Sequence, residues 1–141
     1  MHGRGLLLRW QDLRQIILRF RDVNPSFDYY TPVIIGNNEF LKNEPETAKK
    51  FLSAVKKGYE DAIENPKAAA EVLCEASPEL DKDLVLASQE YLKDQYVADA
   101  KKWGYIDPDR WNRFYNWLNE NGLTETEIPE NTGFSNDYLP E

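Results

Sequence analysis

The run Asp28-Tyr29-Tyr30 places a carboxylate beside two aromatic rings, a combination suited to binding a flat polar molecule. Aromatic faces can stack on a planar ligand, while a carboxylate or a phenol hydroxyl can hydrogen-bond to its polar atoms. We therefore take Asp28, Tyr29 and Tyr30 as candidate ligand-binding residues. The alternative is that the two tyrosines fill a core and cover an edge of the fold.

These residues introduce an extended element. Residues 29–35 are rich in aromatic and β-branched side chains and end at the turn sequence 36–38, which predicts one buried β-strand. A buried strand needs a partner, because unpaired N–H and C=O groups cost free energy. The other extended candidate is residues 15–23, and no second strong strand follows Ile35. The sequence therefore predicts that the main partners of this strand lie outside the chain.

The rest of the chain predicts helices, several of which begin at a proline. Proline suits the first turn of a helix and disfavours helical backbone in the residue before it. The helices expected from these signals and from apolar spacing are residues 43–65, 66–76, 81–97 and 107–121. The tail should be an irregular wrap, anchored by Ile128, Phe134, Tyr138 and Leu139.

Composition limits the class of protein. The chain has 141 residues, 41% hydrophobic and 30% charged, which is typical of one folded domain. Its net charge of −8 argues against nucleic acid as a partner and against an anionic membrane surface. No segment approaches the roughly 20 apolar residues of a membrane span. Near the amino terminus, three leucines before Arg9 are too few to predict a signal peptide.

Residues for catalysis and metal binding are scarce. The single cysteine, Cys74, excludes an internal disulfide and a cysteine-based metal cluster. The single histidine, His2, leaves almost no material for a catalytic triad, a histidine-based metal site or a histidine general base. We expect Cys74 to be a small apolar residue on a buried helix face. The acids in residues 59–64 and 79–83 lack the ligand spacing of an EF-hand loop, which favours a solvated face. The sequence predicts no catalytic residue, metal or cofactor.

Aromatic residues are frequent after residue 102 and have two interpretations. Their rings could stack on a sugar. However, Trp111, Phe114 and Tyr115 follow the spacing of one helix face, which favours a packing stripe. The full group is Trp103, Tyr105, Trp111, Phe114, Tyr115 and Trp117.

Composition changes sharply near residue 21. Residues 1–21 carry five arginines and one acid, whereas the remainder carries 12 basic and 24 acidic residues. All ten basic residues between positions 22 and 109 are lysines. One interpretation is a short basic amphipathic helix. The other is that residues 1–19 come from a wrong start or a shifted reading frame.

From Phe20 onward the sequence resembles the carboxyl-terminal part of ABC-transporter solute-binding proteins for thiamine pyrimidine precursors, the thiamine-biosynthesis-type (NMT1-like) family. The resemblance rests on the stretches "FRDVNPSFDYYTPVIIGNNEFLKNEPETAKKFLSAVKKGYEDAIENPKAAAEVL", "YIDPDRWNRFYNWLNENGL" and "EIPENTGFSNDYLPE". Residues 1–19 do not match, which favours the wrong-start interpretation. Residues 20–141 would then be the part of the chain that belongs to a solute-binding protein.

This resemblance implies an α/β fold, namely the carboxyl-terminal part of the first lobe of a type II periplasmic-binding-protein fold. The part in this chain would be mostly helical with one main β-strand. That strand would return from the second lobe into the first, beside the ligand cleft. The opening strands of the first lobe, the second lobe and the signal sequence would lie outside the chain.

The function implied is that of a fragment of the substrate-binding component of an ABC importer. Its ligand would be a thiamine pyrimidine precursor or a similar small heteroaromatic, contacted by Asp28, Tyr29 and Tyr30. Its macromolecular partner would be an ABC permease. The parent protein would be extracytoplasmic, either in the periplasm or on the cell surface as a lipoprotein.

Two other functions compete with this one. Relatives in the family include an enzyme that makes the thiamine pyrimidine from pyridoxal phosphate and a histidine, and this chemistry needs an active-site histidine and lysine. Because His2 lies in the unmatched segment, we expect no enzymatic activity. The remaining alternative is an independent, acidic helical protein-interaction module.

Overall fold

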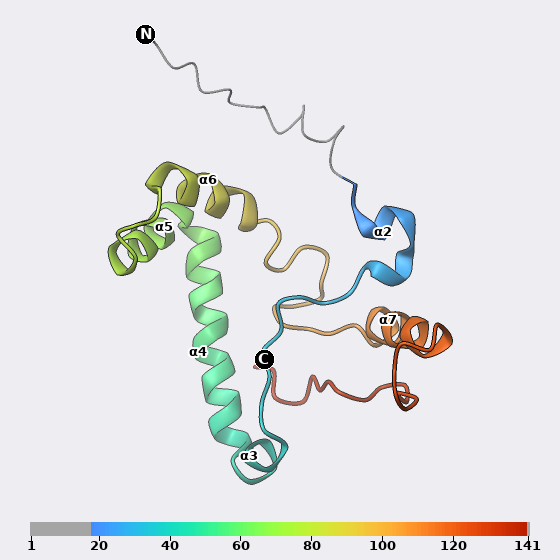
Figure 1. The fold of residues 1–141 in the computed structure, drawn as a ribbon. Coiled ribbons are helices and arrows are strands. Elements are labelled where there is room, and N and C mark those ends of the chain that lie inside the picture. The colour runs from blue at the N-terminus through green and yellow to red at the C-terminus, as the bar shows by residue number, and fades with distance from the viewer. Residues whose placement is uncertain (1–17, 141) are drawn as a thin grey trace. The chain divides into compact units, whose positions relative to one another are not determined.

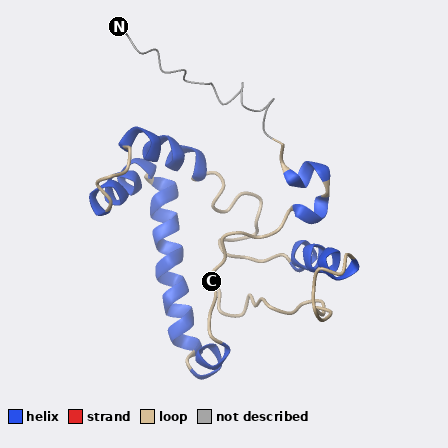
Figure 2. Cartoon of the chain, viewed as in Figure 1, coloured by secondary structure: helices blue, strands red, loops and turns tan. Residues whose placement is uncertain are grey.

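A computed structural model describes residues 18–140, which are mostly helical and form no β-strand (Figure 2). The chain divides into two units. The first unit comprises Met1–Thr31 and Pro108–Glu130, and the second comprises Pro32–Asp107 and Asn131–Glu141.

The second unit contains four helices in sequence (Figure 1). The long helix α4 has α3 at its amino-terminal end and α5 and α6 at its other end. Helix α5 packs against both α4 and α6. Their bounds are Asn38–Asn43 for α3, Pro45–Glu64 for α4, Pro66–Ala76 for α5 and Lys82–Leu92 for α6.

The prolines mark the starts of α4 and α5, as the sequence predicts. Pro45 and Pro66 each occupy the first turn of their helix, where the missing N–H has no intrahelical partner to lose. Asn65 joins the two helices. Its N–H donates to the carbonyl of Asp61 at 2.9 Å, and its Oδ1 accepts from the N–H of Ala68 at 3.2 Å. Asn65 therefore ends α4 with its backbone N–H and begins α5 with its side chain.

Side-chain caps also begin α3 and α6. Asn37 Oδ1 accepts from the N–H groups of Glu39 at 2.8 Å and Phe40 at 3.2 Å. Asp81 Oδ1 accepts from the N–H of Leu84 at 2.9 Å. These bonds satisfy donors that have no partner inside the helix. Helix α6 ends at Leu92, five residues earlier than the sequence predicts, and residues 93–107 are irregular.

The buried core of the described residues consists of small side chains, namely Ala48, Ala70 and Cys74. The expectation that Cys74 lies on a buried helix face is therefore confirmed. Larger side chains in this unit pack through contacts between aromatic rings. The Tyr59 ring on α4 lies 5.0 Å from the ring of Tyr96 and 5.3 Å from that of Trp103, which attaches the irregular residues 93–107 to α4.

The predicted β-strand at residues 29–35 is wrong for the structure described. These residues are irregular, with a bend at Pro32, and Val33, Ile34 and Ile35 are 46%, 55% and 88% exposed. The composition favours a strand, but a strand also requires a neighbour, and none forms among residues 18–140. Asn37 does not close a turn after a strand, because it caps α3.

The first unit contains α2 (Phe20–Val23), the 3-10 helix η1 (Pro25–Phe27) and α7 (Pro108–Glu120). Residues 20–23 are therefore helical and not extended, whereas residues 15–17 of that expected segment lie outside the described residues. The prediction of α7 from residues 107–121 is confirmed. Gly122, with a φ of +64°, ends this helix, and its N–H donates to the carbonyl of Asn119 at 3.1 Å.

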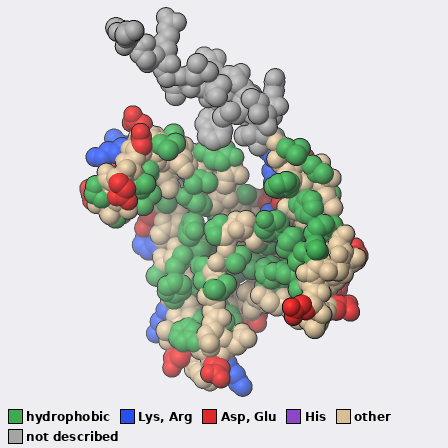
Figure 3. Space-filling model, viewed as in Figure 1, with side chains coloured by type: hydrophobic (Ala, Val, Ile, Leu, Met, Phe, Trp, Pro, Cys, Tyr) green, Lys and Arg blue, Asp and Glu red, His purple; other side chains and the backbone are tan. Residues whose placement is uncertain are grey.

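The tail after α7 is irregular, as expected, and its four predicted anchors are half-buried. Many large apolar side chains elsewhere reach the surface (Figure 3). In the second unit, the exposed ones on helices α3 to α6 are Phe40, Phe51, Val72, Leu73, Leu84 and Tyr91. No helix among residues 18–140 has the length and hydropathy that crossing a membrane requires.

Candidate functional site

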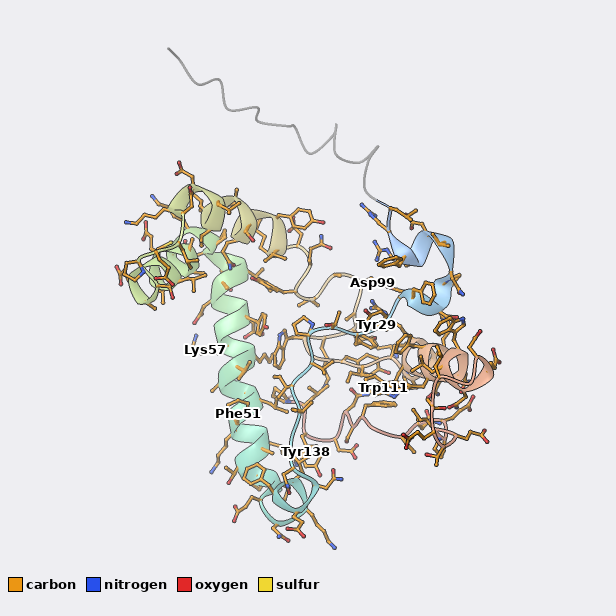
Figure 4. The ribbon with its side chains drawn as sticks, viewed as in Figure 1. Tyr29, Phe51, Lys57, Asp99, Trp111 and Tyr138 are labelled. Atoms are coloured by element: carbon orange, nitrogen blue, oxygen red, sulfur yellow. The ribbon has the colours of Figure 1, made fainter. Side chains whose placement is uncertain are left out.

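The Asp-Tyr-Tyr run (residues 28–30) lies against α7 in the first unit, and Figure 4 shows Tyr29 beside the helix that carries Trp111. Asp28 is bound twice by Arg110. Nη2 of Arg110 donates to Oδ1 of Asp28 at 2.8 Å, and Nε donates to the backbone carbonyl of Asp28 at 3.0 Å. Both side chains are 31% exposed, so this ion pair is partly shielded from water. Arg21 Nη1 lies 3.8 Å from the same carboxylate oxygen.

Each tyrosine of the run has a different partner on α7. The Tyr29 ring stacks on Phe114, with centroids 4.5 Å apart and planes inclined by 23°. The Arg110 guanidinium lies over the Tyr30 ring, 4.4 Å from its centroid, in a cation–π contact. Arg110 and Phe114 are four residues apart and therefore share one face of α7. One helix face thus contacts all three candidate residues.

The aromatic residues of α7 form the packing stripe that the sequence favours. Trp111 lies 4.8 Å from Tyr115, and the Phe27 ring meets Trp117 edge-on at 4.8 Å. Trp103 and Tyr105 of the same sequence group belong to the second unit, where Trp103 packs on Tyr59. Packing contacts thus account for most of this group.

A small cavity of about 30 Å³ lies among the rings of Tyr29, Tyr30, Trp111, Phe114 and Tyr115. This volume can hold one or two waters but not a pyrimidine ring. The Asp-Tyr-Tyr run therefore presents aromatic and polar groups without enclosing a ligand within the first unit.

Sequence reasoning missed Arg110, which is 82 residues from Asp28. One signal was available. Arg110 and Arg113 are the two arginines after a stretch in which every basic residue is lysine. Arginine is favoured where a planar group must bind two acceptors or stack on a ring. Arg110 does both, whereas Arg113 is exposed.

The acids of residues 59–64 form surface ion pairs, whereas Asp81 in residues 79–83 caps α6. Lys57 Nζ lies 3.1 Å from Asp61, and this hydrogen bond raises the pKa of Lys57. Lys93 Nζ lies 2.8 Å from Glu90, and this bond raises the pKa of Lys93 in the same way. Within residues 18–140, no three histidine, cysteine or acidic side chains gather as a metal site would require.

The model of the family described as NMT1/THI5 like matches residues 5–69 of this chain. The matched range includes the Asp-Tyr-Tyr run and α4. It also includes residues 5–19, which lie outside the resemblance that begins at Phe20. The boundary at residue 19 stays a prediction, because residues 1–17 lie outside the described part of the structure.

Curated relatives of the chain include both enzymes and binding proteins. The 4-amino-5-hydroxymethyl-2-methylpyrimidine phosphate synthase of Saccharomyces cerevisiae is 26% identical over 79% of this chain and 31% of its own length. The riboflavin-binding protein of Chloroflexus aurantiacus is 24% identical over 94% of this chain and 39% of its own. The formylaminopyrimidine-binding protein of Halalkalibacterium halodurans is 26% identical over 77% of this chain and 34% of its own.

The chain spans about a third of the length of the curated relatives it matches. The names of these relatives show that they bind or make heteroaromatic molecules, and two of the three are binding proteins. The family as a whole has a periplasmic-binding-protein fold. The resemblance predicted from the sequence is therefore confirmed, and this chain is similar, over residues 5–69, to the NMT1/THI5-like family.

Proposed function

We propose that this chain is part of a substrate-binding protein for a small heteroaromatic molecule, with a thiamine pyrimidine precursor as the favoured ligand. The observation that carries the proposal is the Asp-Tyr-Tyr run, in which a carboxylate and two rings are held on one face of α7. The similarity to riboflavin- and formylaminopyrimidine-binding proteins supports the same ligand class.

In the proposed mechanism, one or both tyrosine rings stack on the ligand, because a planar heteroaromatic gains most from face contact. The polar groups of the run then select among rings by their hydrogen-bonding atoms. Closure of two lobes over the ligand would complete the site, and the closed form would dock on an ABC permease. This mechanism places the parent protein outside the cytoplasm, in the periplasm or on the cell surface as a lipoprotein.

The test uses a rebuilt protein, the Halalkalibacterium formylaminopyrimidine-binding protein with its matching region replaced by residues 20–140 of this chain. Titration calorimetry with formylaminopyrimidine and with riboflavin measures the two affinities. Micromolar or tighter binding of either compound supports the proposal. A rebuilt protein that melts cooperatively but binds neither compound would refute it.

A second candidate function is pyrimidine synthesis, favoured by the similarity to the yeast synthase. The sequence argues against it, since the chain has one histidine, His2. Incubation of the 141-residue chain, which retains His2, with pyridoxal phosphate, followed by mass spectrometry, separates the two functions. Formation of the pyrimidine product would favour the enzyme, and binding by the rebuilt protein without product from the chain would favour the transport role.

The third possibility is an independent acidic helical module that binds another protein. It differs from the others in its folding behaviour. A monodisperse 141-residue chain that melts in one cooperative transition would favour such a module. A heterogeneous chain that binds the dye ANS, which reports exposed apolar surface, would favour the fragment.

A further inference from the structure

We propose that Arg110 positions the Asp-Tyr-Tyr run and thereby sets the affinity of the proposed ligand site. The inference rests on the proposed function for its ligand, but the positioning itself follows from the geometry of the first unit. The role assigned to α7 is to hold the Asp-Tyr-Tyr run in the geometry that binds the ligand.

Three contacts of one guanidinium carry the inference. Nε binds the Asp28 carbonyl, which constrains the backbone just before Tyr29. Nη2 donates to the Asp28 carboxylate at 2.8 Å, and Cζ lies over the Tyr30 ring, 4.4 Å from its centroid. Contacts to a backbone atom, a side chain and a ring together restrict both the path of the run and the orientation of its second tyrosine.

The surroundings of the run make these contacts important. Residues 28–37 contain no regular helix or strand, so no ladder of backbone hydrogen bonds holds the two tyrosines in place. The Tyr29 ring has Phe114 as its support, and the Tyr30 ring has Arg110. Binding is tighter when contact groups are held in their bound geometry beforehand, because less conformational freedom is then lost.

The same contacts redefine the role of Asp28. Its Oδ1 already accepts from Arg110, and Arg21 lies 3.8 Å away. Asp28 thus has a second role, because it orients Arg110 and, through Arg110, the Tyr30 ring that stacks on the ligand.

The first experiment measures positioning in the 141-residue chain without ligand. Tyrosine ring carbons are labelled, and the Tyr30 signals are assigned by comparison with Tyr30→Phe. Arg110→Lys keeps the charge but loses the planar fork, so it cannot reproduce all three contacts. We expect it to shift the Tyr30 ring signals. Arg113→Lys, an exposed arginine on the same helix, is the matched control and should leave them unchanged.

The second experiment measures affinity in the rebuilt protein with formylaminopyrimidine as the probe. Arg110→Lys should raise Kd by about ten-fold, whereas Arg113→Lys should change Kd by less than about two-fold. Asp28→Asn should weaken binding as well. The double variant Arg110→Lys, Asp28→Asn should have a Kd no higher than that of the single variant with the higher Kd, because the two residues act as one unit.

The outcomes separate this inference from the proposed function. Unchanged Tyr30 signals in Arg110→Lys would overturn it. Shifted signals with an unchanged Kd in the folded protein would also overturn it, since Arg110 would then be purely structural. If the unsubstituted rebuilt protein binds neither formylaminopyrimidine nor riboflavin, the proposed function fails and the Tyr30 signals alone decide positioning. If Arg110→Lys does not fold, Asp28→Asn removes the same ion pair and serves in its place.

Discussion

Asn136 pairs with both backbone groups of Ile106 through its side-chain amide. Its Nδ2 donates to the Ile106 carbonyl at 2.8 Å, and its Oδ1 accepts from the Ile106 N–H at 2.9 Å. The amide thus reproduces the pairing of two neighbouring β-strands with a single side chain. The first unit repeats this arrangement. Asn119 binds the N–H of Ile128 at 3.0 Å and its carbonyl at 2.9 Å. These two asparagines hold irregular segments that have no ladder of their own.

Asn136→Ala should destabilise the second unit. It leaves the part-buried N–H and C=O of Ile106 without their partners, at a cost of about 1–3 kcal/mol. Urea unfolding followed by circular dichroism measures the change. Asn43→Ala, an exposed position near the end of α3, is the control and should cost less than about 0.5 kcal/mol. Equal effects of the two substitutions would contradict the pairing.

Asp81→Ala should destabilise α6 by about 1 kcal/mol, because the N–H of Leu84 loses its capping acceptor. Asp81→Asn should have little effect, since asparagine caps nearly as well. Thermal melts of both variants test this difference. If alanine and asparagine lower the melting temperature equally, the charge of Asp81 matters and the cap does not.

The 141-residue chain should bind formylaminopyrimidine only weakly by itself. The cavity at the Asp-Tyr-Tyr run, about 30 Å³, is too small to enclose a ring, so a ligand there would stay largely hydrated. Calorimetry at millimolar ligand should show no saturable heat. Micromolar binding would show that the site is complete within this chain.

Deletion of residues 1–19 should leave the helix content of the remaining chain unchanged and its solubility unchanged or improved. This expectation follows from the abrupt change in composition near residue 21. The alternative is supported by the family match, which begins at residue 5. Circular dichroism distinguishes the two. A loss of helicity beyond the deleted residues would show that the segment belongs to the fold.

Tyr30→Ala in the rebuilt protein should weaken ligand binding more than it weakens folding. Loss of a stacked ring costs about 1–3 kcal/mol, by analogy with bases stacked on aromatic side chains. This corresponds to roughly one to two decades in Kd. Melting curves and titrations on the same samples separate the two effects, and Tyr30→Phe, which keeps the ring, is the control. Lost stability with unchanged affinity would mean that Tyr30 is only a packing residue.

Local signals predicted α4, α5 and α7 well because their causes lie within a few residues, whereas α2 and α3 were not predicted. Pro45, Pro66 and Pro108 each begin a helix, and Gly122 ends one. The strand at residues 29–35 was wrong because pairing depends on a neighbour that local composition does not supply. The candidate run was found from residue type alone, but whether it binds a ligand stays a prediction.

Contacts between residues far apart in the sequence could not be predicted in the same way. Arg110 is 82 residues from Asp28, and Asn136 is 30 residues from Ile106. Arginine and asparagine side chains fit many local environments, so their spacing in the sequence does not identify a distant acceptor. Such contacts depend on how the helices place the irregular segments.

The exposed segment around Val33, Ile34 and Ile35 has a consequence for the behaviour of the chain at high concentration. Residues 29–38 contain ten consecutive positions without a charge. An exposed, uncharged segment with adjacent β-branched residues can pair with copies of itself and lead to aggregation. Charged residues flank the stretch at Asp28 and Glu39, and Pro32 within it has no N–H to donate. These three residues therefore act as gatekeepers that oppose self-pairing of this region.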